Sequence, residues 1–245
     1  MKVVILAGGL GTRLSEYTRL IPKPMVKIGG QPILVHIINI YLRQGFNHFY
    51  IAAGYKKEII KKYFNNYKKN GITFESKILK KKCKITIVDT GYKTLTGGRL
   101  KRIKNFLPDG EDFMFTYGDG ISDINIKKLL KFHIKRKKLI TVTAVRPPAR
   151  FGEIILKRKN VIGFKEKPQV TEGWINGGFF IAKKEFLNLI KSDKTILEKE
   201  PLEQAVKTKN LSAYTHNGFW KCMDTKRDKD ELEKIYKKNK FNWKI

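Results

Sequence analysis

Short runs of β-branched and aromatic residues alternate along the chain with stretches in which apolar residues recur at helical spacing. The short runs predict strands over residues 2–6, 49–53, 72–77, 86–89, 113–117 and 140–145. The helical spacing predicts helices over residues 33–42, 58–64 and 126–133. Strands that alternate with helices are typical of a mainly parallel sheet with helices on both faces, so we expect an α/β fold.

The pattern changes after residue 146. Residues 153–156 and 161–165 predict a hairpin, residues 175–182 predict a further strand, and residues 225–238 predict a closing helix. No internal repeat and no linker rich in proline, glycine or serine interrupts the sequence. We therefore expect one domain over residues 1–245, with two parts that meet near residue 146.

Composition narrows the class of protein. Hydrophobic residues make up 41% of the chain, which is enough for a sizeable core. No apolar run approaches the roughly 20 residues that a membrane span needs, and the apolar start of the chain is too short for a signal peptide. Cys83 and Cys222 stand in no metal-ligand spacing, so we expect free thiols. These features predict a cytoplasmic protein with no membrane partner.

The chain is strongly basic, with 52 lysines and arginines against 22 acidic residues and a formal net charge of +30. The lysines are spread along the whole sequence. A base-stacking surface would require basic residues that alternate with aromatic ones, and such alternation is rare here. We therefore expect a solvated lysine-rich surface and no nucleic-acid partner. The same positive field would still concentrate anionic phosphate compounds near the protein.

Three glycines, Gly8, Gly9 and Gly11, follow the first predicted strand and precede Arg13. Main-chain amides in such a turn bind phosphate, and an arginine fork adds a bidentate donor. The loop differs from a P-loop, because no Gly-Lys-Ser/Thr follows, and from a dinucleotide fingerprint, because Leu14 takes the third glycine position. The loop predicts a phosphate site, and the alternative is a tight turn that binds nothing.

Prolines on both sides of Lys23 restrict the main chain there, which would fix the direction of its ammonium. Asp119 stands between two glycines at the end of a predicted strand, a position that suits an oxygen ligand of Mg²⁺. Asp224 is the natural second ligand. Two alternatives remain open on these residues alone: Asp119 can cap its own turn, and Asp224 can cap the helix over residues 225–238.

The glycine loop through Leu14, followed by Pro22-Lys23-Pro24-Met25, resembles the signature of the sugar nucleotidyltransferases. Further motifs resemble, in order and spacing, the glucose-1-phosphate cytidylyltransferases within that family. They are Val88-Asp89-Thr90-Gly91, Thr96-Gly97-Gly98-Arg99-Leu100, Tyr117-Gly118-Asp119-Gly120, Glu166-Lys167-Pro168, Ile175-Asn176-Gly177-Gly178-Phe179-Phe180 and Met223-Asp224-Thr225. The Thr-Gly-Gly-Arg motif is the one that indicates the cytidylyl branch.

The resemblance implies a Rossmann-like three-layer fold, a mixed and mainly parallel sheet with helices on both faces and a smaller β-rich sugar-binding part. Residues 1–145 would form mainly the nucleotide-binding half and residues 146–245 mainly the sugar-binding half. It also implies CTP and glucose 1-phosphate as substrates, Mg²⁺ as cofactor and a homo-oligomer. The segment over residues 77–85 is shorter and more basic than the excursion that contributes to subunit contacts in the family.

The resemblance also implies site residues. The nucleotide-binding set is Leu6, Ala7, Gly8, Gly9, Leu10, Gly11, Thr12, Arg13, Lys23, Thr96, Arg99 and Gly118. The sugar-phosphate set is Glu166, Lys167, Asn176 and Gly177, and the catalytic set is Arg13, Lys23, Asp119, Lys167 and Asp224. Asp119 and Asp224 would hold the metal. Gly177 and Gly178 would leave space for a sugar ring.

The implied chemistry needs no protein nucleophile, since an oxygen of the sugar phosphate attacks the α-phosphorus of CTP in line and pyrophosphate leaves. Arg99, with Thr96, would read the base: cytosine offers two adjacent acceptors to a guanidinium fork, whereas uracil presents a donor at N3. The alternative for Arg99 is a solvent-facing helix residue. Rival functions are the same chemistry with another pyrimidine nucleotide or sugar phosphate, and a non-catalytic sugar-nucleotide or nucleic-acid binding protein.

Overall fold

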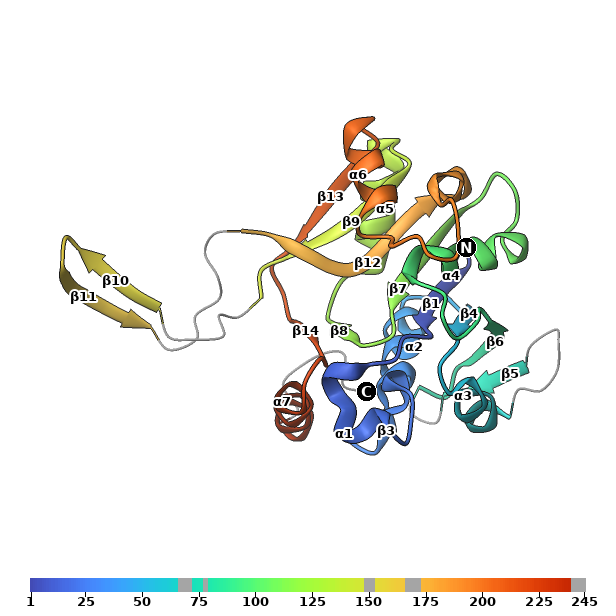
Figure 1. Ribbon diagram of the computed structural model, residues 1–245, viewed down its shortest axis with the longest axis horizontal. Helices are drawn as coiled ribbons and strands as arrows, with labels where there is room; N and C mark the ends of the chain where they lie inside the picture. The colour runs from blue at the N-terminus through green and yellow to red at the C-terminus, as the bar shows by residue number, and fades with distance from the viewer. Residues whose placement is uncertain (66–71, 77–78, 148–152, 166–172, 239–245) are drawn as a thin grey trace.

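One eight-stranded sheet carries the fold of the computed structural model, which describes residues 1–65, 72–76, 79–147, 153–165 and 173–238 (Figure 1). Its order is β13-β9-β12-β7-β1-β4-β6-β5. The strands are β1 (Val3–Ala7), β4 (His48–Ala53), β5 (Ile72–Glu75), β6 (Lys82–Asp89), β7 (Asp112–Tyr117), β9 (Ile140–Val145), β12 (Ile175–Lys183) and β13 (Leu211–His216).

Four neighbouring strands, β7, β1, β4 and β6, run parallel, and β12 runs antiparallel between β7 and β9. At the edges, β13 pairs parallel with β9 and β5 pairs antiparallel with β6. The sheet is therefore mixed and mainly parallel, as predicted. Because parallel strands end at the same edge, the segments after β1, β4, β6 and β7 gather on one side of the sheet, where open α/β sheets bind their ligands.

Helices cover both faces of the sheet, so the central strand β1 is buried on both sides. Val3 and Ile5 of β1 pack into one core cluster, and Val4 and Leu6 pack into the other. The first cluster receives α2 (Ile33–Arg43), α3 (Lys57–Phe64), α5 (Ile126–Arg136) and α7 (Lys226–Lys237). The second receives α4 (Thr96–Ile103), α6 (Glu200–Lys207) and η4 (Lys184–Leu189). The predicted three-layer architecture is confirmed.

Small elements complete the chain. The hairpin of β10 (Glu153–Lys157) and β11 (Asn160–Lys165) lies away from the main sheet in Figure 1. β8 (Gly120–Ser122) pairs with β14 (Trp220–Cys222), and β2 (Lys27–Ile28) pairs with β3 (Gln31–Pro32). The remaining elements are η1 (Thr12–Leu14), α1 (Ser15–Thr18), η2 (Lys23–Met25) and η3 (Lys104–Phe106).

Some predicted boundaries were wrong, and several elements were not predicted, β13 and α6 among them. The strand expected over residues 86–89 begins at Lys82, and the strand expected over residues 72–77 ends at Glu75. β13 escaped prediction because it is an edge strand in which only Ser212 is buried, so its sequence shows no apolar alternation. α6 buries only Pro201 and Ala205, which is too few to show a helical period. Among the described helices, none is both long enough and apolar enough to cross a membrane.

Candidate active site

A cavity of about 1120 Å³ lies at the edge of the sheet where the parallel strands end. Pockets for drug-sized ligands have volumes of roughly 300–1,000 Å³, so this cavity is large enough for a ligand of that size. Most of the predicted site residues line it. They are Leu6, Ala7, Gly8, Gly9, Gly11, Thr12, Arg13, Lys23, Thr96, Arg99, Gly118, Asp119, Asn176 and Asp224.

Arg99 of α4 is almost fully buried, with 3% of its surface exposed, so the solvent-facing alternative is wrong. Its Nη2 donates to the Gly8 carbonyl at 2.8 Å. Its Nη1 donates to the Gly91 carbonyl at 2.8 Å and to Thr90 Oγ1 at 2.7 Å. A Cβ atom on Gly54 would lie 2.3 Å from Nη1. One guanidinium therefore joins the segments that follow β1, β4 and β6.

The two glycines beside Arg99 let another segment approach the start of α4. The amides of Gly97 and Gly98 donate to the Thr195 carbonyl at 3.0 and 3.4 Å, which satisfies helix donors that otherwise lack partners. A Cβ atom on Gly98 would lie 2.5 Å from the main chain of Asp193. Thr96 is also occupied here: its hydroxyl donates to Glu198 Oε2 at 2.8 Å.

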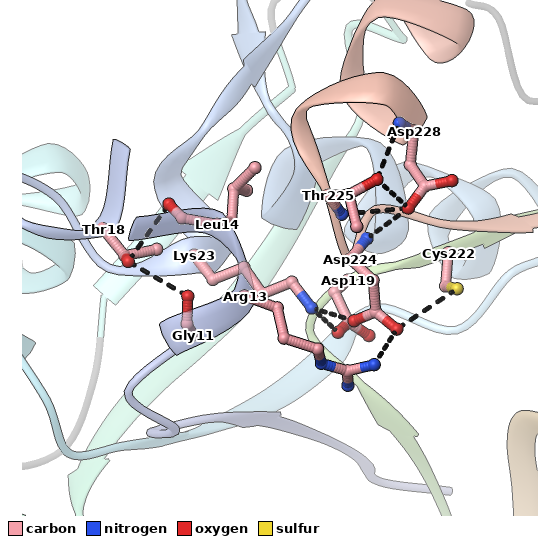
Figure 2. A network of polar contacts seen from close by, with 10 residues as sticks. All are labelled: Gly11, Arg13, Leu14, Thr18, Lys23, Asp119, Cys222, Asp224, Thr225 and Asp228. Carbon is pink, nitrogen blue, oxygen red and sulfur yellow. Dashed lines mark hydrogen bonds and ion pairs between the residues drawn. The ribbon is translucent and has the colours of Figure 1, made fainter. Parts of the chain in front are cut away.

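Within the glycine loop, Gly11 has a left-handed main-chain conformation, and Gly9 has empty space at its side-chain position. Gly11 has a φ of 66°, and its carbonyl accepts a hydrogen bond from the Thr18 hydroxyl at 3.0 Å (Figure 2). A Cβ atom on Gly8 would lie 2.1 Å from Arg99 Nη1, whereas a Cβ atom on Gly9 would meet nothing within 4 Å. Gly8 is therefore required by protein packing, and Gly9 borders open space in the cavity.

A cluster of opposite charges stands beside this loop. Lys23 Nζ lies 2.5 Å from Asp119 Oδ2 and 2.6 Å from Asp224 Oδ1. Arg13 Nη1 lies 2.8 Å from Asp224 Oδ2, and the Arg13 side chain is 71% exposed (Figure 2). The predicted lysine, arginine and carboxylates thus meet at one place, although Lys23 and Asp224 are 201 residues apart.

The cluster controls the protonation of its members. Burial alone would lower the pKa of Lys23, but the carboxylates of Asp119 and Asp224 outweigh burial and raise the pKa above its usual value. Lys23 therefore carries a full positive charge at neutral pH. Burial, with Asp224 and Asp119 adding to it, raises the pKa of the Cys222 thiol to about 12, so this cysteine stays neutral beside Asp224.

The helix cap settles an alternative for Asp224. Thr225 is the N-cap of α7: its hydroxyl accepts from the Asp228 amide at 3.3 Å, and Asp228 Oδ2 accepts from the Thr225 amide at 2.9 Å. The Asp224 carboxylate therefore faces Lys23 and Arg13 and does not cap the helix. The Asp119 carboxylate likewise faces Lys23, which disfavours a role limited to capping its own turn.

The two carboxylates fit a magnesium ion. They already converge on one cation, the ammonium of Lys23. Mg²⁺ is commonly bound by one or two carboxylates together with waters and substrate phosphates, so two aspartates suffice. Within the described residues, no group of three or more histidines, cysteines, aspartates or glutamates could hold a metal. A metal here would therefore share its ligands with solvent or substrate.

The predicted sugar side is only partly within the described residues, because Glu166 and Lys167 lie outside them. Asn176 lines the cavity, whereas the side-chain position of Gly177 is filled: a Cβ atom there would lie 2.7 Å from Val145 Cγ1. The expectation that Gly177 leaves space for a sugar ring is wrong, because that space belongs to the neighbouring strand. Leu10 does not line the cavity either and is 44% exposed.

Several lining residues were not predicted. Those at the ends of strands and in the loops are Pro24, Thr94, Leu95, Tyr117, Pro147 and Ile175. Those near the carboxyl end of the chain are Trp220, Lys221, Cys222, Thr225, Arg227, Asp228 and Glu231. β14 has three half-buried residues, which is too short a run to show a period. For the lining residues near the carboxyl end of the chain, the one signal in the sequence was that they lie close to Asp224.

Comparisons with known proteins agree with this geometry. A family model described as nucleotidyl transferase matches residues 2–229. The chain is 46% identical to the glucose-1-phosphate cytidylyltransferase of Salmonella typhimurium over 254 residues, which cover 100% of this chain and 99% of the relative. It is 40% identical to the probable glucose-1-phosphate cytidylyltransferase of Bacillus subtilis, with 100% of each chain covered.

Solved structures share the fold. A putative glucose-1-phosphate thymidylyltransferase from Bacillus anthracis superposes with a TM-score of 0.73 at 17% identity, covering 99% of this chain and 97% of that one. A UDP-glucose pyrophosphorylase complexed with UDP-glucose also gives a TM-score of 0.73, at 18% identity, covering 98% of this chain and 99% of that one. At such identities the likeness concerns the fold alone.

The two glycines of the loop should respond differently to alanine. Gly8→Ala would displace the Arg99 guanidinium and break its buried hydrogen bonds, so we expect the free energy of unfolding to fall by about 1–3 kcal/mol. Gly9→Ala meets open space and should change stability by less than about 0.5 kcal/mol. Urea unfolding of both variants measures this. Equal losses would contradict the packing role assigned to Gly8.

Proposed function

Since this chain belongs to the nucleotidyl transferase family, we propose that it transfers a cytidylyl group from CTP to α-D-glucose 1-phosphate and releases pyrophosphate. The observation that carries the proposal is the meeting of Arg13, Lys23, Asp119 and Asp224 beside the glycine loop. Loop amides and two cations suit a triphosphate, and two carboxylates suit its metal. The names of the Salmonella and Bacillus relatives support the choice of nucleotide and sugar.

The proposed reaction is one in-line substitution at phosphorus. An oxygen of the sugar phosphate forms a bond to the α-phosphorus of CTP, and the bond from that phosphorus to the pyrophosphate oxygen breaks. The chain would contribute position and charge. Amides of the glycine loop would hold the triphosphate, Arg13 would stabilise the leaving pyrophosphate, and Lys23 would meet the α-phosphate. Although Arg13 pairs with Asp224, its side chain is 71% exposed, so its guanidinium can also meet an incoming phosphate.

Asp119 and Asp224 would hold Mg²⁺, which supplies positive charge against the phosphate oxygens when bound. In the structure Lys23 bridges the two carboxylates, and Arg13 supplies the second positive charge at Asp224. A second cation on those carboxylates would free the Lys23 ammonium for a substrate phosphate. The proposal therefore gives Lys23 two successive partners, first the aspartates and then the α-phosphate.

The sugar side of the proposal names Lys167 for the attacking phosphate, and Glu166 and Asn176 for sugar hydroxyls. A hydroxyl both donates and accepts, so a carboxylate and an amide are suitable partners. Asn176 lines the cavity, which supports its part in the proposal. CTP and sugar phosphates are cytoplasmic metabolites, so the proposed reaction implies a cytoplasmic location.

Cytosine selection is proposed to depend on Arg99, with Thr96 beside it. Both residues line the cavity, and Arg99 fixes the Gly8 carbonyl at the start of the glycine loop. The base would meet either the remaining guanidinium protons or the main chain that Arg99 holds in place. Uracil carries a proton at N3 where cytosine has an acceptor, so a donor placed for cytosine loses its partner with uracil.

A homo-oligomer is also proposed. Ile154, Val161 and Ile162 of the hairpin β10–β11 are each more than half exposed, and such apolar side chains are often covered in an assembly. Light scattering of the purified protein should give a mass that is a multiple of 28.4 kDa. A mass of one chain at micromolar concentration would contradict this part of the proposal.

The reaction and its metal can be tested together. Purified protein should release pyrophosphate from CTP only when glucose 1-phosphate is present, lose this activity in a chelator and regain it with Mg²⁺. Asp119→Asn and Asp224→Asn should each lower kcat by at least about 100-fold, the scale of losing one electrostatic stabiliser. Asp230→Asn, on the exposed side of α7, is the control and should retain activity. Full activity of either site variant in a chelator would contradict the metal assignment.

The nucleotide preference should depend on Arg99. Arg99→Ala removes a charge-assisted donor worth about 1.5–3 kcal/mol, so kcat/KM for CTP should fall by roughly 10- to 150-fold. Because Arg99 also holds the glycine loop, turnover of UTP should fall as well, but by less than turnover of CTP, so the ratio of the two kcat/KM values is the measurement. Arg102→Ala removes a half-exposed arginine of the same helix and should leave the ratio unchanged. An unchanged ratio in Arg99→Ala would move cytosine recognition to the main chain of residues 6–10.

A further inference from the structure

A chain of hydrogen bonds crosses the rim of the cavity from α4 to β12. Glu198 Oε2 accepts from the Thr96 hydroxyl at 2.8 Å, and Glu198 Oε1 accepts from the Tyr117 hydroxyl. The Tyr117 oxygen in turn accepts from Asn176 Nδ2 at 3.2 Å. Thr96, Tyr117 and Asn176 line the cavity, whereas Glu198 does not. Glu198 thus connects a residue of the proposed nucleotide side with one of the proposed sugar side.

The segment that carries Glu198 is held firmly on α4. The Leu95 amide donates to the Asp193 carbonyl at 2.8 Å, and the Gly97 amide donates to the Thr195 carbonyl at 3.0 Å. The Leu197 amide donates to Thr96 Oγ1 at 3.0 Å. Glycines at 97 and 98 are required for this approach, because a Cβ atom on either would meet the segment at less than 3 Å. The carboxylate of Glu198 is therefore presented from a fixed main chain, although its side chain is exposed.

The Glu198 carboxylate determines which groups donate and which accept along this series of hydrogen bonds. A carboxylate only accepts, so Tyr117 must donate its single proton to Glu198 and can only accept from Asn176. Burial, with Glu198 adding to it, raises the pKa of Tyr117 well above its usual range, so the phenol keeps that proton. The Gly178 amide donates to Asn176 Oδ1 at 2.8 Å. Both ends of the Asn176 amide are thereby assigned.

The Tyr117 hydroxyl keeps its position between Glu198 and Asn176 because neighbouring residues restrict the ring. It packs edge-on against Phe180 with ring centroids 5.8 Å apart, and a Cβ atom on Gly178 would lie 2.7 Å from it. Asn176 still has one amide proton and one lone pair to offer to a ligand. Without Tyr117 and Glu198, Asn176 Nδ2 would lose its acceptor, and the Gly178 amide alone would hold the side chain.

We propose that Glu198 is a positioning residue for the sugar phosphate: through Tyr117 it fixes the orientation in which Asn176 meets a sugar hydroxyl. The proposal rests on the proposed function, because it assumes that the ligand beside Asn176 is a sugar. It assigns Glu198 no contact with substrate. It also gives a role to the two hydrogen bonds that the exposed Glu198 carboxylate accepts from protein hydroxyls.

Steady-state kinetics with the full-length protein test this proposal. Glu198→Ala and Tyr117→Phe should each raise KM for glucose 1-phosphate by about 3- to 10-fold, the scale of one lost hydrogen bond. Tyr117→Phe keeps the hydrogen bond between Thr96 and Glu198, so it should change KM for CTP by less than about 2-fold. Glu200→Ala removes the same charge two residues away and should change neither constant. In an Asn176→Ala background, adding Glu198→Ala should have no further effect on KM for glucose 1-phosphate, because the residue through which Glu198 acts is gone.

Three results would overturn the proposal while the wild-type protein is active. Unchanged KM values in both single variants would show that the network does not affect the sugar. Equal rises for glucose 1-phosphate and CTP would indicate a general disturbance of the rim. A persistent effect of Glu198→Ala in the Asn176→Ala background would place Glu198 on the substrate itself. A wild-type protein that releases no pyrophosphate would instead overturn the proposed function, and this inference with it.

Discussion

The guanidinium of Arg99 holds together the loops on which the rest of the site is built. It donates from the inside of the protein to the carbonyls of Gly8 and Gly91 and to the Thr90 hydroxyl. Hydrogen bonds from a charged donor contribute about 1.5–3 kcal/mol each, and a buried acceptor left without its donor costs a similar amount. The phosphate-binding shape of the glycine loop therefore depends on a residue of α4, and the glycines at 8 and 54 are required to admit that residue. Structure and proposed base selection then depend on the same side chain.

The charged cluster gives the second condition for function. With Lys23 between two carboxylates and Arg13 on Asp224, the cluster is close to neutral by itself. A surface with a net charge of +30 attracts anionic substrates, but at the site the cations are already paired. A metal would bring positive charge to the aspartates, and a triphosphate would bring negative charge to Lys23 and Arg13. If both bound, each side chain of the cluster would keep a partner of opposite charge. This is why we expect nucleotide and metal to bind together.

Much of the fold and of the site was predictable, for identifiable reasons. The strands of the parallel core are short apolar runs, and the loops with Arg13, Lys23 and Asp119 follow strands or lie between prolines, so local sequence reveals them. Long-range packing is what local sequence does not reveal. Arg99 meets Gly8 across 91 residues, and Thr96 meets Glu198 across 102. The prediction for Gly177 was wrong because a glycine indicates that another group approaches the main chain but does not identify that group. At Gly177 the approaching group is the Val145 side chain and not a sugar. β13 lacked a pattern because it lies at an edge of the sheet.

The identity of the product tests the central claim most directly. The protein would be incubated with Mg²⁺, glucose 1-phosphate and equal concentrations of CTP, UTP, dTTP and GTP, and the sugar nucleotide that forms would be identified by mass spectrometry. The proposed site predicts CDP-glucose as the main product, in excess over UDP-glucose by roughly one to two orders of magnitude, because uracil leaves a buried donor unpaired. A mixture that follows the nucleotide concentrations, or a main product with another base, would contradict the account.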